Sequence, residues 1–275
     1  MVIEEFAPAK LNLALHVTGL RDDGYHLLDS LVVFADIGDR LRLSPGALSL
    51  SIDGPFAQGL SAPDNLCLEA ARLVGVDAAI SLTKNLPLAS GIGGGSADAA
   101  AVLRGLARMG ADMPDAPETL GADVPVCLAS RPARMRGVGE VLDTVPDLPE
   151  LHLLLINPGV PVPTPSVFRA LTQKENAPLP PMPAAFDLNA LIDYLSTCRN
   201  DLEDPAISVC PAIADVLRAI DDEGALLSRM SGSGATCFGI FESASAAGLA
   251  AYRIGTLSSD WWITTTRLAP APTAG

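Results

Sequence analysis

Apolar and polar positions alternate through the early part of the chain, with short turn signals between the alternating runs. A period of two residues is typical of half-buried strands. We expect strands over 11–17, 27–37, 40–43 and 48–52. A helix is expected over 66–74, because Leu66, Ala70 and Leu73 share one helical face, and another strand over 79–84.

The later part of the chain begins with a proline-rich stretch over 160–183. Beyond it, the pattern predicts helices over 188–198, 211–223 and 244–252, and strands over 224–230, 236–242 and 261–266. We therefore expect an N-terminal domain over 1–157 and a C-terminal domain over 158–275. Helices and strands follow each other without the regular repeat of a doubly wound parallel sheet, which favours the α+β class.

Composition limits the classes of function. The chain has 275 residues, of which 49% are apolar and 18% charged, and its formal net charge is −14. The apolar fraction excludes a disordered chain. The acidic balance argues against nucleic-acid binding, which needs a surplus of Lys and Arg. A nucleotide site built from backbone N–H groups remains compatible with this charge.

The cysteines and the apolar runs indicate a cytoplasmic protein. The five cysteines are odd in number, widely spaced and without a C-x-x-C pair: Cys67, Cys127, Cys198, Cys210 and Cys237. This pattern fits neither a disulfide framework nor a zinc site, so we expect small buried thiols. The first residues lack the features of a signal peptide, and no run of 18 apolar residues occurs, so we expect no membrane association.

The most unusual stretch is glycine-rich and reads Asn85-Leu-Pro-Leu-Ala-Ser-Gly-Ile-Gly-Gly-Gly-Ser96. An alanine-rich helical pattern follows from Ser96 to Ala107. Glycines allow positive φ and close approach of a ligand, and the first N–H groups of a helix attract anions. We therefore expect a phosphate-binding loop, although a flexible surface turn is the alternative. Neither the P-loop pattern nor the dinucleotide fingerprint fits, because Ser96 stands where each needs another residue.

Three motifs in order resemble the GHMP kinases, a family named after galactose, homoserine, mevalonate and phosphomevalonate. The glycine-rich loop over 87–97 is the second motif, between Ala7-Pro-Ala-Lys-Leu-Asn-Leu13 and Met230-Ser-Gly-Ser-Gly-Ala-Thr236. The resemblance implies a two-domain α+β fold, with an N-terminal domain like domain 2 of ribosomal protein S5 and a ferredoxin-like C-terminal α/β sandwich. It also implies ATP with Mg²⁺ as the co-substrate, with no protein ligand assigned to the metal.

Within the family, the chain resembles the branch that phosphorylates the 2-hydroxyl, a tertiary alcohol, of a cytidine-diphosphate-linked methylerythritol on the way to isoprenoid precursors. The segments that carry this are 8–13, Asp23-Gly-Tyr-His-Leu27, Gly121-Ala-Asp-Val-Pro125 and Asn200-Asp-Leu-Glu203. The partner implied is this small molecule, and the protein itself is expected to be a monomer or weak homodimer.

The chain departs from the branch at two places. The stretch over 110–121 is short, and Thr197-Cys-Arg199 stands where an aromatic residue often precedes Asn200. Two alternatives remain open: another kinase of the family, acting on mevalonate, homoserine or a sugar, and a nucleotide-binding regulator without catalysis.

Lys10 and Asp123 are the candidate catalytic residues. Both charges stand among apolar neighbours, where a charge is costly unless it is paired or functional. A carboxylate can take or orient the hydroxyl proton, and an ammonium can offset the developing negative charge. The alternative is a structural ion pair or two solvated charges.

The resemblance assigns the remaining site residues. ATP binding is expected at Pro87, Leu88, Ala89, Ser90, Gly91, Ile92, Gly93, Gly94, Gly95, Ser96, Ala97, Asn65 and Lys84. Substrate binding is expected at Asn12, Tyr25, His26 and Thr164, and the third motif comprises Ser231, Gly232, Ser233 and Gly234.

Several of these assignments have a structural alternative. Asn65 suits a helix cap, and Lys84 suits a surface charge at a strand end. Tyr25 and His26 suit surface or core filling, and residues 231–234 suit an ordinary hairpin turn. His16 and His152 match no motif and are expected to be structural.

Overall fold

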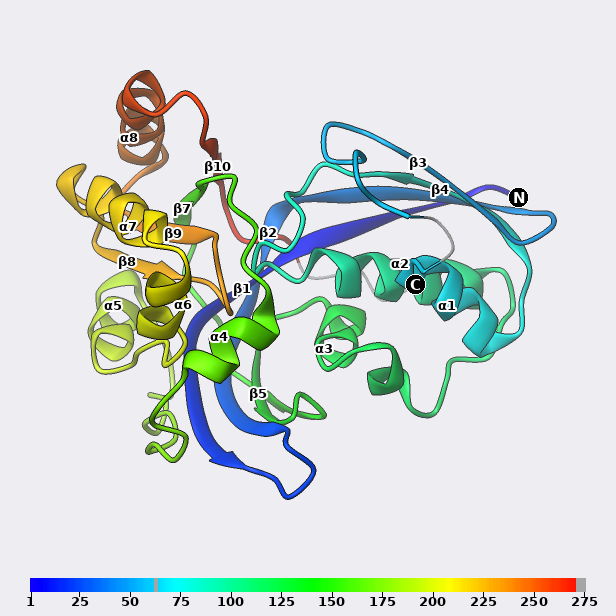
Figure 1. Cartoon of the computed structure of the whole chain (residues 1–275), viewed down its shortest axis with the longest axis horizontal. Helices are drawn as coiled ribbons and strands as arrows, with labels where there is room; N and C mark the ends of the chain where they lie inside the picture. Colours follow the sequence, from blue (N-terminus) through cyan, green and yellow to red (C-terminus); the bar gives the residue numbers. More distant parts are fainter. Residues whose placement is uncertain (62–63, 271–275) are drawn as a thin grey trace.

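Two β-sheets organise the chain, one of six strands and one of four (Figure 1). The computed structural model describes residues 1–61 and 64–270. Helices cover both sheets, and strands and helices mix along the sequence, so the α+β expectation is confirmed. Among the described residues, no helix has both the length and the apolar character needed to cross a membrane.

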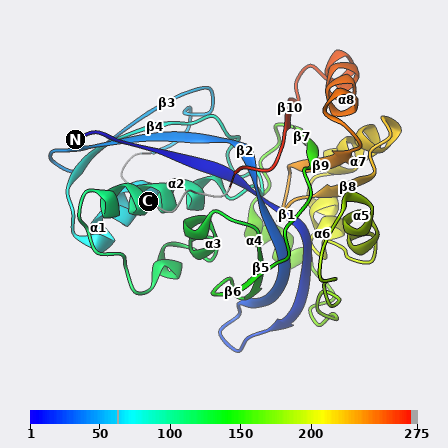
Figure 2. The same ribbon diagram turned by 180° about the vertical axis from the view of Figure 1, so that it is seen from behind.

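The six-stranded sheet has the order β3-β4-β2-β5-β6, and β1 pairs with β2 outside this path. Its strands are β1 (Ile3–Leu20), β2 (His26–Pro45), β3 (Ser49–Asp53), β4 (Ala78–Thr83), β5 (Ala133–Gly137) and β6 (Val141–Thr144). Both views show β1 and β2 as a long ribbon that bends toward the second half of the molecule (Figures 1 and 2).

The separate strands expected over 27–37 and 40–43 are one continuous strand, because the ladder between β1 and β2 runs through Gly38 and Asp39. A Cβ on Gly38 would lie 2.8 Å from the Cα of Pro8, so Gly38 allows close pairing here rather than a turn.

Three helices cover the six-stranded sheet, and a short 3₁₀ segment contacts the first and the third of them. They are α1 (Leu66–Val74), α2 (Gly94–Arg108), the 3₁₀ turn Pro117–Leu120 within the short 110–121 stretch, and α3 (Val124–Ala129). The buried face of α2 consists largely of alanines, including Ala97 and the run 99–101. Small side chains let this helix approach the sheet closely, which places its N-terminus beside β1.

The four-stranded sheet has the order β10-β7-β9-β8, and all of its neighbours are antiparallel. Its strands are β7 (His152–Asn157), β8 (Leu227–Met230), β9 (Cys237–Phe241) and β10 (Trp262–Thr266). The helices of this half are α4 (Thr164–Ala170), α5 (Leu188–Ser196), α6 (Glu203–Val209), α7 (Ala212–Asp222) and α8 (Ala244–Leu257). Along the chain, β7 is followed by the helices α4 to α7, the strands β8 and β9, the helix α8 and the strand β10. This is the βαββαβ order of ferredoxin-like folds, with extra helices in the first connection.

Alternate residues of β7 pack into two different hydrophobic cores. Leu153 and Leu155 pack with apolar residues of β1 and β2, whereas Leu154 and Ile156 pack with α4, α6, α7 and α8. Because β7 belongs to the four-stranded sheet, we propose that the domain division lies before Leu151 rather than after residue 157.

Several elements differ from the sequence expectations. The strand expected from residue 224 begins at Leu227, and the helix expected to end at residue 252 continues to Leu257. The helix α4 forms inside the proline-rich stretch, because its prolines occupy the cap and the first turn, where a missing N–H has no cost. All five cysteines are free and buried, as expected.

Candidate active site

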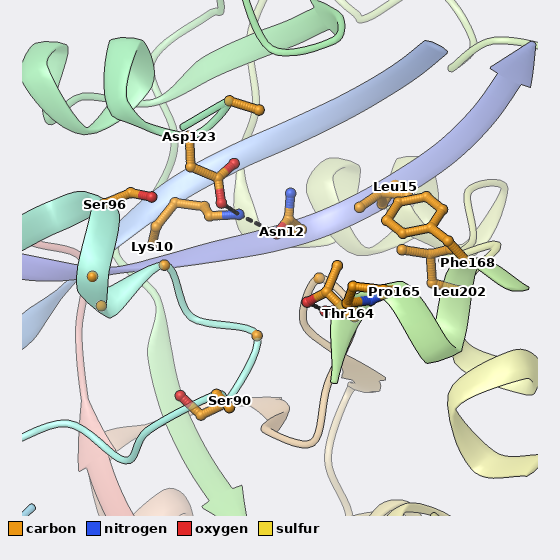
Figure 3. A pocket seen from close by; sticks show the side chains of 18 of the residues that line it. Lys10, Asn12, Leu15, Ser90, Ser96, Asp123, Thr164, Pro165, Phe168 and Leu202 are labelled. Atoms are coloured by element: carbon orange, nitrogen blue, oxygen red, sulfur yellow. Dashed lines mark hydrogen bonds and ion pairs between the residues drawn. The ribbon is translucent and has the colours of Figure 1, made fainter. Parts of the chain in front are cut away.

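A cavity of about 1040 Å³ brings the three sequence motifs together. Its walls come from β1, β2, the glycine-rich loop, the start of α3, α4 and the turn between β8 and β9. Figure 3 shows Lys10, Asp123, Ser96 and Thr164 around this space. Segments far apart in the sequence therefore meet at one site, as the motif order predicted.

The glycine-rich loop lies against the start of α2. Gly93 caps the helix with a φ of 67°, and Gly91 has a φ of 74°, so both need the left-handed region that favours glycine. The helix begins at Gly94, two residues before the expected Ser96. Its first backbone N–H groups have no intrahelical acceptor and lie at the positive end of the helix dipole. This geometry supports an anion site.

Most of the residues expected to bind ATP line the cavity. The lining residues are Pro87, Leu88, Ala89, Ser90, Gly91, Gly93, Gly94, Gly95 and Ser96. Ile92 and Ala97 are instead buried in the core, where they anchor the two ends of the glycine run. The backbone carbonyl of Ile92 accepts from the N–H of Lys10 at 2.9 Å, which joins the loop to β1.

Lys10 and Asp123 form an ion pair at the centre of the cavity wall. The Nζ of Lys10 lies 3.0 Å from Oδ2 of Asp123 and donates to Oδ1 of Asn12 at 2.8 Å. Lys10 is buried, which excludes two solvated charges. Asp123 is the N-cap residue of α3, and its side chain makes no capping hydrogen bond, so its carboxylate is left to pair with Lys10 and to line the cavity.

Asn12 is held by its neighbours on both ends of its side chain. Its amide donates to Oγ of Ser30 at 2.7 Å, while its oxygen accepts from Lys10. Ser30 in turn donates to the carbonyl of Ala14 at 2.7 Å. Asn12, expected to bind the substrate, lines the cavity, and its contacts orient the Lys10 ammonium.

The third motif is the hairpin turn between β8 and β9, and it packs directly on the glycine-rich loop. The hydroxyl of Ser231 accepts from the N–H of Asn12 at 3.0 Å and donates to the carbonyl of Gly91 at 3.1 Å. A Cβ on Gly232 would lie 2.7 Å from that same carbonyl. The turn is thus a hairpin connection, as one alternative held, and its glycines also allow backbone-to-backbone contact with the loop.

The turn also reaches the other wall of the cavity. The hydroxyls of Ser233 and Thr164 are 2.7 Å apart, and both residues line the cavity. Thr164 is the first residue of α4, so the contact connects that helix to the turn. The expected substrate residue Thr164 is therefore near the Lys10–Asp123 pair in the same cavity (Figure 3).

Lys84 is buried between two carboxylates and is not the surface charge that one alternative held. Its Nζ bonds to Asp39 and, at 2.7 Å, to Oδ2 of Asp98. Burial disfavours the ammonium, but the two carboxylates outweigh this effect and raise the pKa of Lys84. Burial, together with the charge of Asp39, raises the pKa of Asp98 to about 8 although Lys84 opposes it. The Oδ1 atom of Asp98 is buried without a hydrogen-bond partner.

Asn65 serves as the helix cap that its sequence position allowed. Its side chain accepts from the N–H of Cys67 at 2.9 Å, at the start of α1. It also lines the cavity beside Leu66, Lys84 and Gly95. The cap thus fixes Asn65 at the end of the cavity next to the glycine-rich loop.

An aromatic cluster lies at the other end of the cavity. Tyr25 is 62% exposed and His26 is half-buried, and both line the cavity. The ring of His26 stacks on Phe168, with centroids 4.6 Å apart. Burial, and secondly the charge of Lys174, lowers the pKa of His26, so the ring is neutral near pH 7. Its Nε2 atom is buried and has no hydrogen-bond partner.

Phe168 was missed by the sequence reasoning, which looked for an aromatic residue before Asn200. Phe168 lines the cavity from α4, four residues after Thr164 and so one helical turn away on the same face. That spacing was the signal available in the sequence.

The 200–203 segment supports the glycine turn from behind. The amide of Asn200 donates to the carbonyls of Met230 and Gly232, each at 2.8 Å. The carboxylate of Glu203 accepts from the N–H of Met230 at 2.7 Å. This segment was singled out as a family motif, and its contacts are with the backbone of the third motif.

The fold and the site together are those of a small-molecule kinase of the GHMP type. The family model for the GHMP kinases N terminal domain matches residues 65–129, and the model for the GHMP kinases C terminal matches residues 182–256.

Comparisons with relatives and solved structures place the chain in one group within the family. The chain is 63% identical over 269 residues to the 4-diphosphocytidyl-2-C-methyl-D-erythritol kinase of Paracoccus denitrificans, covering 97% of each chain. It is 58% identical over 272 residues to the enzyme of the same name from Ruegeria pomeroyi, covering 95% of this chain and 98% of that one. A crystal structure of 4-(cytidine 5'-diphospho)-2C-methyl-D-erythritol kinase has 34% identity and a TM-score of 0.78, covering 98% of this chain and all of that one. The chain belongs to the GHMP kinase family, in the group formed by the 4-diphosphocytidyl-2-C-methyl-D-erythritol kinases.

Proposed function

We propose that this protein transfers the γ-phosphoryl group of ATP to the 2-hydroxyl of 4-diphosphocytidyl-2-C-methyl-D-erythritol, in the supply of isoprenoid precursors. The observation that carries the proposal is the position of the Lys10–Asp123 pair. It lies in one cavity with the glycine-rich loop and with the cluster of Tyr25, His26 and Phe168. The printed names of the curated relatives support the same substrate.

The end of the cavity at the glycine-rich loop suits ATP. Unpaired N–H groups at the start of α2 would bind the phosphates without a cluster of basic side chains. This explains how a chain with a net charge of −14 binds a polyanion. Asn65 places a polar side chain on the cavity wall beside the loop, where the base of ATP would lie, whereas Lys84 is held by Asp39 and Asp98 behind it.

A magnesium ion fits the oxygen donors of this site. The hydroxyl of Ser96 lines the cavity near the start of α2, and hard oxygen donors are the ligands that Mg²⁺ prefers. Ser96 would hold the ion together with the phosphates of ATP, and the ion would neutralise phosphate charge.

The aromatic end of the cavity suits the cytidine group of the substrate. Tyr25 offers an exposed ring for stacking, and Phe168, which stacks on His26, offers a second aromatic side chain on the cavity wall. The unpartnered Nε2 of His26 would hydrogen-bond the polar edge of the base. The methylerythritol group would then extend past Thr164 toward Lys10 and Asp123.

The reaction follows from these positions. The carboxylate of Asp123 accepts the proton of the substrate hydroxyl as its oxygen bonds to the γ-phosphorus and the bond to ADP breaks. The ammonium of Lys10, held by Asn12, offsets the negative charge on the reacting oxygens. The net change is transfer of one phosphoryl group, with the proton taken up by the carboxylate.

The proposal includes a cytoplasmic enzyme that acts as a monomer or weak homodimer, without nucleic acid or membrane. The acidic charge and the cavity with its polar and aromatic lining support a small-molecule partner.

The test measures ADP release with the cytidine diphosphate compound, mevalonate and homoserine in parallel, using parent protein and the Asp123→Asn variant. We expect turnover with the cytidine compound alone, and its loss in the variant. Faster turnover of mevalonate or homoserine would assign a different kinase of the family. No turnover of any compound, with ATP still bound in calorimetry, would favour the regulator.

A further inference from the structure

His16 occupies a buried position on β1, four residues beyond Asn12, and both of its ring nitrogens have partners. Its Nδ1 lies 2.9 Å from the carbonyl oxygen of Ala177. Its Nε2 lies 3.2 Å from the backbone nitrogen of Arg199, whose N–H donates to it. A carbonyl can only accept and a backbone N–H can only donate, so the proton is on Nδ1 and Nε2 is the acceptor. This pair of contacts fits only a neutral ring.

The contact from Arg199 belongs to a short pairing between the 199–201 segment and β1. The N–H of Leu15 donates to the carbonyl of Arg199 at 2.9 Å, and the N–H of Asp201 donates to the carbonyl of Leu15 at 2.8 Å. The N–H of Val17 donates to the carboxylate of Asp201 at 2.7 Å. The Nε2 atom of His16 adds a side-chain acceptor on β1, which binds the backbone of this segment at Arg199, its N-terminal residue.

This segment in turn fixes the glycine turn of the third motif. Both N–H groups of the Asn200 amide are used on the carbonyls of Met230 and Gly232. Its oxygen accepts from the N–H of Leu202 at 3.0 Å, so the Asn200 side chain has no freedom to follow a displaced turn. The turn carries the contacts to Gly91 and Thr164 described above. A shift of residues 199–201 would therefore move the turn relative to both ends of the cavity.

We propose that His16 is a positioning residue of this site: its neutral form holds the 199–201 segment so that Asn200 fixes the glycine turn against the phosphate loop and Thr164, and its protonation releases that support. The inference rests on the proposed function only for its kinetic consequence. The contacts of the ring stand independently of the substrate.

The charges around His16 favour the neutral form near pH 7. Burial is the largest effect and lowers its pKa, the carbonyl of Ala177 opposes this, and the positive charge of Arg199 adds to the lowering. The carboxylates of Asp201 and, from β2, Asp29 act in the opposite direction. Asp29 is itself paired with Arg134 of β5 at 2.6 Å, which limits its effect. Protonation would turn the acceptor at Nε2 into a donor facing a donor.

The first test is spectroscopic and needs no substrate. Long-range ¹H–¹⁵N correlation spectra of the parent protein report the tautomer of each histidine, and the chain has three, so variants of His26 and His152 assign the signals. We expect His16 with its proton on Nδ1 and a titration midpoint below 6.5. A proton on Nε2, or a midpoint at or above 6.5, would overturn the inference.

The second test is kinetic and uses a matched pair of variants. His16→Gln places an acceptor near the position of Nε2, whereas His16→Asn keeps only a group near Nδ1. We expect His16→Gln to stay within about threefold of the parent in kcat/KM at pH 7.5, because the support for the turn is retained. We expect His16→Asn to lose between about 5- and about 150-fold, the range set by one unpaired buried donor. His152→Asn, on β7 outside the cavity, is the control and should equal the parent.

The pH profile separates positioning from a general loss of stability. The parent should lose kcat/KM at acidic pH as His16 becomes protonated, and His16→Gln should not show that component, since its amide does not titrate. His26 is unchanged in both proteins, so its own titration cancels in the comparison. Equal losses in the Gln and Asn variants, or identical pH profiles for the parent and the Gln variant, would overturn the inference. If His16→Asn does not fold, the tautomer and the Gln profile decide it. Absence of turnover in the parent would instead reject the proposed function.

Discussion

The ammonium of Lys10 and the carboxylate of Asp123 meet at 3.0 Å with very different exposure: 4% for the lysine side chain and 29% for the aspartate. The lysine is enclosed and held by Asn12, whereas the aspartate keeps part of its surface open to the cavity. A structural ion pair needs no such asymmetry. The difference in exposure suits a pair in which the buried ammonium supplies a fixed positive charge and the partly exposed carboxylate contacts the substrate.

The first prediction concerns this pair. Asp123→Asn should keep the fold and the affinity for ATP and lower kcat by about 10²- to 10⁴-fold, the usual contribution of a general base. Lys10→Ala should also lower kcat, and the double variant should lose less than the product of the single losses, because the two residues act as a unit. Saturating kinetics with both substrates measure this.

Asp53→Asn, at the exposed end of β3, is the matched control for removing one carboxylate. It should leave kcat unchanged. If Asp123→Asn retained a kcat within about threefold of the parent, well short of general-base catalysis, Asp123 would be only a structural partner of Lys10.

The second prediction concerns the contact between the glycine-rich loop and the glycine turn. Alanine at Gly91 would bring its Cβ to 2.7 Å from the backbone nitrogen of Gly234, so the two segments must separate. Affinity for a non-hydrolysable ATP analogue, measured by titration calorimetry, should fall by about 5- to 150-fold, the effect of a strained backbone position.

Gly110→Ala is the control for backbone strain alone, because Gly110 also has a positive φ but no atom near its Cβ position. Both variants should lose some stability, and only Gly91→Ala should lose ATP affinity. Equal ATP affinities in the two variants would mean that the contact does not shape the phosphate site.

The third prediction concerns the aromatic end of the cavity. Stacking on an aromatic side chain contributes about 1–3 kcal/mol per base, so Tyr25→Ala and Phe168→Ala should each raise the KM for the cytidine substrate by about 5- to 150-fold. The KM for ATP should barely change. Steady-state kinetics with each substrate varied in turn separate the two effects.

Tyr252→Ala, an exposed tyrosine on α8 far from the lining residues, is the control for loss of an aromatic ring. A change in the KM for ATP in place of that for the cytidine substrate would place the aromatic cluster at the nucleotide end.

The fourth prediction concerns the buried carboxylates around Lys84. Asp98 has a pKa of about 8 in the folded protein and an ordinary value when unfolded. The folded state then binds the proton more tightly, so stability falls as pH rises from about 4 through about 8. Asp98→Asn removes this effect, and its melting temperature should fall less between pH 6 and pH 9 than that of the parent.

Asp39→Asn should instead destabilise the protein, because Asp39 also accepts from the N–H groups of Asn85 and Leu86, at 2.6 and 2.9 Å. We expect it to lower the melting temperature at every pH. Parallel pH dependences for the parent and Asp98→Asn would show that Asp98 is ionised throughout.

Local chemistry explains what could be predicted from the sequence. A period of two marked β3 and β4, and the glycine run marked the loop before the alanine-rich helix. The helix α1 forms where it was expected, but Leu73 of its expected apolar face is exposed, and Cys67, Leu68, Ala70 and Ala71 are buried instead. The family motifs predicted that Lys10 and Asp123 lie at one site, before any contact between them was known. Each of these signals lies within a few consecutive residues, where steric limits and hydrogen-bond needs act directly on the chain.

Tertiary structure decided the rest, because it depends on which distant segments pack together. Nothing near Lys84 in the sequence indicates that its ammonium would be buried and paired with Asp39. Nothing near His26 indicates that its ring would stack on Phe168. The assignment of β7 to the second sheet likewise follows from its pairing with β9 and β10 rather than from its own apolar run. The sequence alone determined the chemistry available to this protein. The packing of two sheets around one cavity decided which side chains are buried, which are paired and which face the substrate, because burial and pairing are properties of the assembled surfaces and not of any single segment.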